Sequence, residues 1–197
     1  MNKKDNQRMR LTKLLFKNSL IFLLQKKSIY QISVTELCNN AELNRSTFYK
    51  YYDNVRDILT ELEKETLQRS KRCMQEIAAG EENFHIAPLY HLLCDVQNNK
   101  DIYQLLLNNS TNDGFPADMM QETIEFLRDK AKSFNITEKE KSDYLFQYLV
   151  SGCISVVQNW INGPMKETPM EISELIYHTS VAVMKSVKNK KEDSYAI

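Results

Sequence analysis

The sequence predicts an all-α fold made of a small N-terminal and a larger C-terminal helical domain. Only four glycines and four prolines occur among the 197 residues, so the turn residues that many short strands would need are scarce. Apolar residues instead recur at the spacing of amphipathic helices through most of the chain. A hydrophobic fraction of 42% is enough for the core of one large domain or two small ones.

The first predicted helix covers residues 8–27. Its apolar residues begin as a stripe and spread to nearly the whole circumference toward its end, which indicates a helix that begins amphipathic and ends buried. These residues are Leu11, Leu14, Leu15, Phe16, Leu20, Ile21, Phe22, Leu23 and Leu24.

Two short predicted helices follow, joined by a tight turn. Ser33 can cap a helix over residues 34–41, and Glu36 three residues later completes the pattern of a capping box. Asn44 can cap a second helix that ends near residue 52. Two short helices joined in this way form a helix-turn-helix, whose second helix is the candidate recognition helix.

The remaining helices are expected to be longer. Asn54 can cap a connecting helix over residues 55–79, and we place the domain boundary inside it, near residue 60. The expected domains are therefore 1–60, a three-helix DNA-binding domain of the helix-turn-helix type, and 61–197, a larger helical domain. Further helical patterns cover residues 86–98, 100–109, 116–134, 138–162 and 169–189.

Charge is distributed unevenly between these two domains. Residues 1–60 contain 11 basic and five acidic residues, an excess of six positive charges, and the rest of the chain carries the opposite excess because the whole chain has a net charge of zero. A basic N-terminal domain predicts binding to a polyanion.

Residues 10–60 resemble the DNA-binding domain of the TetR family of transcriptional regulators. The resemblance is carried by the segments Ile32-Ser33-Val34-Thr35-Glu36-Leu37-Cys38, Ala41-Glu42-Leu43-Asn44 and Ser46-Thr47-Phe48-Tyr49-Lys50-Tyr51-Tyr52. They are similar to the family's T-V-x-x-I-A, A-G-V-S and G-T-F-Y-x-Y-F patterns. The resemblance implies a regulator whose recognition helix enters the major groove of a near-palindromic, double-stranded operator.

The resemblance also implies which residues face DNA. In the recognition helix these are Arg45, Ser46, Thr47, Tyr49, Lys50 and Tyr51. At the start of the preceding helix, Ser33 and Thr35 are expected to contact phosphates. The chemistry agrees, because an arginine can donate two hydrogen bonds to guanine and hydroxyl groups can reach phosphate oxygens. Arg45 is therefore the candidate for direct reading of a base.

Two positions depart from the family pattern. The family's turn glycine is replaced by Glu42, so either the turn accepts a residue other than glycine or Glu42 lies on its rim. The family's phosphate-binding lysine at the start of the connecting helix is replaced by Val55. Arg56 is the candidate substitute, on a different face of the helix.

The C-terminal region weakly resembles the regulatory domains of a Firmicutes-type subgroup, through Trp160-Ile161-Asn162-Gly163. The family resemblance implies a homodimer whose last two helices form a four-helix bundle with those of the partner. The helix over 138–162 has two apolar faces and so needs two neighbours, either in a dimer or within a buried monomer helix. The expected interface residues are Ser151, Gly152, Ile154, Ser155, Ile176 and Val183.

A mixture of large side chains with single polar tips suggests an effector pocket. The candidate lining residues are Tyr90, Tyr103, Phe126, Tyr144, Gln147 and Tyr148. No lysine or arginine occurs in residues 144–161, so the expected effector is a small, neutral or cationic, hydrophobic molecule that releases the operator. The alternative is that these aromatic residues only pack the core.

The sequence favours a cytoplasmic regulator without a cofactor, a metal or a catalytic function. No apolar run is long enough to span a membrane, and the four cysteines lie in apolar helical patterns typical of reduced, buried thiols. His91, Cys94 and Asp95 share a helical face but are too few for a convincing metal site. Three hypotheses stay open: a repressor that senses a small molecule, a regulator of the same fold that docks a protein partner, and, least favoured, an enzyme.

Overall fold

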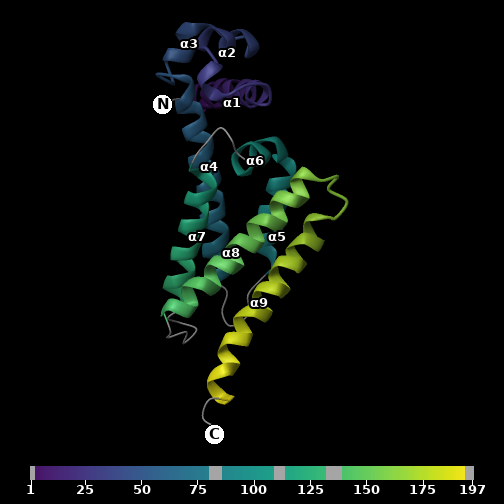
Figure 1. The fold of residues 1–197 in the computed structure, drawn as a ribbon. Helices are drawn as coiled ribbons and strands as arrows, with labels where there is room; N and C mark the ends of the chain where they lie inside the picture. The colour runs from purple at the N-terminus through teal and green to yellow at the C-terminus, as the bar shows by residue number, and fades with distance from the viewer. Residues whose placement is uncertain (1–2, 80–85, 109–113, 132–138, 194–197) are drawn as a thin grey trace. The chain divides into compact units, whose positions relative to one another are not determined.

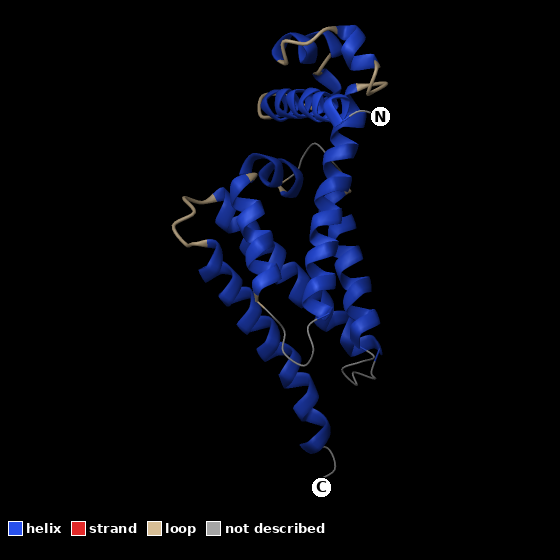
Figure 2. Ribbon diagram, turned by 180° about the vertical axis from the view of Figure 1, so that it is seen from behind, coloured by secondary structure: helices blue, strands red, loops and turns tan. Residues whose placement is uncertain are grey.

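The computed structural model describes residues 3–79, 86–108, 114–131 and 139–193, and within these ranges every regular element is a helix (Figures 1 and 2). The predicted all-α fold is confirmed. In chain order the elements are α1 (Lys3–Leu24), the 3₁₀ helix η1 (Ile29–Gln31), α2 (Val34–Asn40), α3 (Arg45–Tyr49), α4 (Val55–Ala79), α5 (Ala87–Asn98), α6 (Lys100–Leu107), α7 (Phe115–Ala131), α8 (Lys139–Asn162) and α9 (Pro169–Asp193).

Two compact units divide the chain inside α4, between Thr66 and Leu67. This division lies six residues beyond the boundary that we expected from the sequence. The first unit contains α1, η1, α2, α3 and the first half of α4, and the second contains the rest of α4 together with α5 to α9.

An aromatic core holds the first unit together. The rings of Phe16 in α1 and Phe48 in α3 are both fully buried and meet edge to face, with 5.5 Å between their centroids. Leu37 of α2 and Ile58 of α4 are also fully buried. All four helices of the helix-turn-helix unit therefore contribute to one core, which fixes α3 from its inner side.

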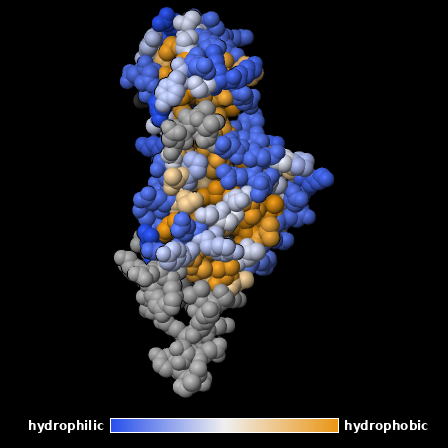
Figure 3. Space-filling view, viewed as in Figure 1, coloured by the Kyte–Doolittle hydropathy of each residue, from blue (hydrophilic) through white to orange (hydrophobic). Residues whose placement is uncertain are grey.

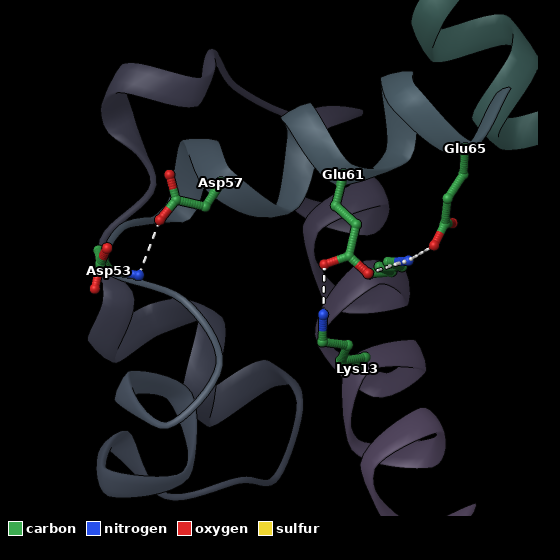
Figure 4. A network of polar contacts seen from close by, with 6 residues as sticks. Lys13, Asp53, Asp57, Glu61 and Glu65 are labelled. Carbon is green, nitrogen blue, oxygen red and sulfur yellow. Dashed lines mark hydrogen bonds and ion pairs between the residues drawn. The ribbon is translucent and has the colours of Figure 1, made fainter. Parts of the chain in front are cut away.

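A network of charged residues also links α1 to α4. The Nζ atom of Lys13 lies 2.8 Å from Oε2 of Glu61, and Nζ of Lys17 lies 3.0 Å from Oε1 of the same carboxylate and 2.7 Å from Oε1 of Glu65 (Figure 4). Burial of Glu61 raises its pKa, but the hydrogen bonds from Lys13 and Lys17 outweigh this, so the pKa is lowered overall. Beside this carboxylate, burial raises the pKa of Tyr52.

Capping side chains define where the helices of the first unit begin. The Ser33 hydroxyl accepts a hydrogen bond from the Glu36 backbone N–H at 3.2 Å, as predicted. The Glu36 carboxylate does not complete the expected capping box but pairs with Lys27. Asn54 caps α4 as predicted, through a 3.2 Å bond from the Asp57 N–H to its Oδ1 atom.

The second unit is a bundle in which α8 packs against α6, α7 and α9, and α9 packs against α5. Its fully buried side chains include Leu106, Phe146 and Ile161. Trp160 is also buried, and its indole N–H donates a 2.9 Å hydrogen bond to the Glu167 carbonyl, which ties the end of α8 to the loop before α9.

The carboxylate of Asp95 lies at the centre of a polar cluster in this unit. It accepts hydrogen bonds from the Tyr103 hydroxyl at 2.8 Å and from Nδ2 of Asn99 at 2.9 Å, and Nε of Arg69 lies 3.3 Å away. The cluster therefore joins α4, α5 and α6. On the sequence alone, Asp95 shares a helical face with His91 and Cys94, the residue types of a metal site. In the structure its carboxylate contacts Tyr103 of α6 and Arg69 of α4.

Candidate nucleic-acid interface

The recognition helix α3 has one buried and one exposed side. Phe48 is fully buried in the aromatic core, whereas Arg45, Ser46, Tyr49 and Lys50 are exposed and Thr47 is partly exposed. The helix is shorter than predicted, because the N–H groups of Tyr51 and Tyr52 both bond back to the Phe48 carbonyl and close the helix in a turn. Tyr51 is partly exposed after this turn.

Arg45 and Tyr49 form a pair on the exposed side of α3. The Nη2 atom of Arg45 lies 3.4 Å from the Tyr49 hydroxyl, and its guanidinium carbon lies 6.0 Å from the centre of the Tyr49 ring. This hydrogen bond raises the pKa of Arg45. The pair presents a permanently charged planar donor group of the kind that reads guanine.

The turn between α2 and α3 contains a residue in the left-handed region. Glu42 has a φ angle of 54° and its side chain is exposed. The turn therefore accepts a residue other than glycine in the backbone conformation that favours glycine. It also places the Glu42 side chain on the rim, so the two alternatives considered from the sequence are both met. A non-glycine residue in this conformation costs about 1 kcal/mol.

The start of α2 and the start of α4 supply further polar groups. Ser33 and Thr35 are exposed, as a phosphate contact requires. Val55 is buried, so it cannot act as the phosphate ligand that the family has at this position. Arg56 is exposed, and its Nη1 atom donates a 3.3 Å hydrogen bond to the hydroxyl of Tyr30.

Sequence reasoning did not single out Tyr30 as a functional residue. It is 82% exposed, although its neighbours Ile29 and Ile32 are buried. The one sequence feature that could have pointed to Tyr30 is its position between Ile29 and Ile32, outside the apolar pattern that these two residues form. Its bond to Arg56 spans 26 residues of the chain, and local periodicity cannot reveal a contact of that kind.

The structure does not gather the six candidate effector residues into one internal cluster. Tyr103 is buried and bonds to Asp95, while Tyr90 and Phe126 are partly exposed. Tyr144 and Tyr148 are 76% and 69% exposed, and Gln147 beside them is exposed as well. The three residues of α8 therefore lie on the surface of the subunit.

The candidate dimer residues are also divided. Gly152 and Ser155 are exposed and Ser151 is partly exposed, as an interface requires. Ile154 and Val183 are partly exposed, whereas Ile176 is 93% buried within the subunit. Ile176 is thus part of the core of the second unit.

Comparisons with known proteins show which fold this geometry has. Residues 87–180 match a family described as a transcriptional regulator C-terminal region. A TetR transcriptional regulator from Streptococcus agalactiae has a similar structure, with 23% identity, a TM-score of 0.60, and coverage of 89% of this chain and 97% of that one. The chain has the fold of the TetR-family transcriptional regulators.

Other solved structures share this TetR fold. A TetR-family regulator from Syntrophomonas wolfei has 13% identity and a TM-score of 0.63, with 88% of this chain and 94% of that one covered. FadR from Bacillus subtilis, solved in complex with stearoyl-CoA, has 16% identity and a TM-score of 0.57, with 88% and 96% covered. No curated protein matches the sequence. None of the described helices combines the length and apolar composition needed to cross a membrane.

Proposed function

We propose that the protein is a homodimeric transcriptional repressor that binds a near-palindromic operator through α3. The observation that carries this proposal is the two-sided structure of α3. Phe48 fixes its inner side in the core, while Arg45, Tyr49 and Lys50 stand exposed on the other side. A short helix held rigidly in this way can enter a major groove and present charged and hydroxyl groups to bases and phosphates.

An exposed face of α8 supports the homodimer. Tyr144, Tyr148, Gly152, Ser155 and Asn159 are all exposed and recur at intervals of three or four residues, so they share one side of the helix. A Cβ atom built on Gly152 would meet nothing within 4 Å, so the subunit leaves open space there.

Exposed apolar residues on α9 extend this surface. Leu175 is 49% exposed, with Thr179 and Ala182 exposed along the same side of α9. Figure 3 shows hydrophobic side chains over the region of α8 and α9. A second copy of the chain would cover these residues, and two helices from each subunit would form a four-helix bundle.

Release by a small hydrophobic effector is the mode of regulation that we propose. FadR from Bacillus subtilis, which has this fold, was solved with an acyl-CoA. Acyl-CoA carries phosphate groups, whereas residues 144–161 of this chain contain no lysine or arginine to pair with an anion, so we propose a neutral or cationic effector here. The exposure of Tyr144 and Tyr148 supports a place on the proposed dimer face better than one in an internal pocket.

Selection from a pool of random duplexes tests the proposed function. The full-length protein is expected to enrich a near-palindrome, with recognition helices about 34 to 36 Å apart or a multiple of that spacing. Arg45→Ala should lose about 1 to 3 kcal/mol of binding free energy, mainly at one base pair of each half-site, whereas Lys50→Ala should weaken binding to all sequences. Failure of the wild-type protein to enrich any motif would refute the operator hypothesis.

A further inference from the structure

The 3₁₀ helix η1 holds Tyr30 in a fixed and outward position. Ile29 and Ile32 on either side of it are buried in the core of the first unit. Backbone hydrogen bonds from Gln31 to Ser28 and from Ile32 to Ile29 close the turn, and the Gln31 side chain accepts a further bond from the Ser28 N–H at 3.2 Å. The ring of Tyr30 is 82% exposed, so burial does not explain the presence of a large aromatic residue here.

Arg56 is similarly fixed at its base and exposed at its tip. It lies in the first turn of α4, between the buried Val55 and Asp57, whose backbone N–H bonds to the capping residue Asn54. Within the described residues, its side chain makes one hydrogen bond, from Nη1 to the Tyr30 hydroxyl at 3.3 Å. A guanidinium group has five N–H donors, so this bond leaves donors for another acceptor.

Two acidic side chains of the first unit, Asp57 and Glu36, have other partners. The Asp57 carboxylate accepts a bond from the Asp53 N–H at 2.8 Å (Figure 4). It also accepts one from the Asn54 N–H at 3.1 Å. Glu36 pairs with Lys27. No carboxylate in the described residues forms an ion pair with Arg56, so its charge is available to an external anion.

The Tyr30–Arg56 bond connects the segment before α2 with the segment after α3, the two helices of the helix-turn-helix. Tyr30 lies three residues before Ser33, the N-cap of α2, and Arg56 lies seven residues after Tyr49, the last residue of α3. In a helix-turn-helix bound to DNA, the first helix crosses the phosphate backbone while the second enters the groove. The segments beside the start of α2 and after the end of α3 are therefore close to the phosphates that border the groove.

We propose that Tyr30 and Arg56 together bind one DNA phosphate, with Tyr30 as a positioning residue for the guanidinium group. The inference rests on the proposed DNA-binding function. It adds a phosphate contact made outside α3 to the base contacts proposed for that helix. While the Tyr30 oxygen accepts a bond from Arg56, its own O–H can donate to the phosphate. The remaining guanidinium N–H groups donate to the same anion, which is the strong, charge-assisted form of hydrogen bond.

Binding of the full-length protein to a random-sequence duplex, measured between about 50 and 200 mM salt, tests this proposal. Arg56→Ala should weaken binding roughly tenfold and make the slope of log K against log salt shallower by about 0.9, the value for one phosphate. Tyr30→Phe keeps the ring and should weaken binding about threefold without changing the slope. In a protein that already carries Arg56→Ala, Tyr30→Phe should have a smaller effect than in the wild type, because only the direct bond from the Tyr30 O–H to the phosphate remains to be lost.

Two controls separate failure of this inference from failure of the proposed function. Lys64→Ala removes another exposed charge from α4 and should leave both affinity and slope unchanged, while Lys50→Ala should weaken binding. If Lys50→Ala weakens binding but the variants of Tyr30 and Arg56 match the wild type, the phosphate contact is wrong and the DNA-binding function stands. Equal effects of Tyr30→Phe with and without Arg56 would exclude the positioning role. If the wild type does not bind duplex DNA, both proposals fail.

Discussion

Gln104 of α6 bonds to the end of α8, and Gln158 of α8 bonds to the end of α6. The Nε2 atom of Gln104 in α6 donates to the Ile161 carbonyl in the last turn of α8 at 2.6 Å. The Nε2 atom of Gln158 in α8 donates to the Leu107 carbonyl at the end of α6, also at 2.6 Å. Because the last carbonyls of a helix have no partner within it, each glutamine satisfies an acceptor that would otherwise be costly to bury.

Replacing one of these glutamines should destabilise the second unit. Gln158→Met preserves length and helix propensity but leaves the Leu107 carbonyl without its donor, at an expected cost of about 1 kcal/mol in the free energy of unfolding. Gln158→Glu should cost more, because it places an acceptor against an acceptor. Urea denaturation measures both. Gln97→Met on the exposed side of α5 is the matched control, and an equal cost there would show that the reciprocal bonds are unimportant.

Glu61 should make the stability of the first unit depend on pH. Its pKa is lowered in the folded protein by hydrogen bonds from Lys13 and Lys17, despite the opposing effect of burial. The stabilisation is therefore present above the pKa of an unfolded glutamate, about 4.3, and is lost as the pH falls through the lower folded value. Glu61→Gln should cost about 1 to 2 kcal/mol at pH 7, and the difference from the wild type should shrink below about pH 4.

Denaturant titrations of the wild type and Glu61→Gln over this pH range measure the effect. Glu174→Gln, on the exposed side of α9, provides the control and should differ little from the wild type at any pH. A difference between the wild type and Glu61→Gln that stays constant from pH 7 to the acid range would contradict the proposed origin of the stabilisation.

Glu42→Gly should increase stability, although most substitutions decrease it. Glu42 has a φ angle of 54° and an exposed side chain, so glycine would relieve backbone strain without loss of packing. The expected gain is up to about 1 kcal/mol, reduced by the greater freedom of glycine in the unfolded chain. Lys64→Gly in the middle of α4 should instead lose about 1 kcal/mol. Opposite signs for the two variants in thermal or urea unfolding would support the assignment of strain to the turn.

Local signals in the sequence located the helices but not all of their caps, because the Asn44 side chain makes no capping bond at α3 and Glu36 pairs with Lys27 in place of completing a capping box. The predicted range of α4 agrees with the observed Val55–Ala79, because Asn54 supplies a capping oxygen and a sparse apolar stripe continues to Ile77. The predicted end of α3 was wrong because the apolar pattern continues to Tyr52, whereas the backbone turns after Tyr49. Periodicity reports which side chains share a face but not where the hydrogen bonding changes.

Long-range relationships explain what the sequence could not predict in the candidate sites. Tyr144 and Tyr148 share a face with Gly152, but the pattern does not reveal whether a pocket or a partner covers that face. Similarly, Ile176 has the apolar character of an interface residue, and its burial against other helices of the same subunit became apparent only from the fold. The bond between Tyr30 and Arg56 depends on two segments that only the folded core brings together.

Tyr148→Asp should break the dimer without unfolding the subunit. Tyr148 is 69% exposed in the single chain, so a charge at this position stays solvated in the monomer, whereas burial in an interface would desolvate it without a partner. An Asp at Ile176 is a poor test because that residue is 93% buried and the subunit itself would be destabilised. Sedimentation velocity at micromolar concentration should give a dimer for the wild type and a monomer for Tyr148→Asp, with helical circular dichroism unchanged. Tyr30→Asp, at a more exposed tyrosine of the first unit, should remain dimeric, and a dimeric Tyr148→Asp protein would assign the interface to another surface.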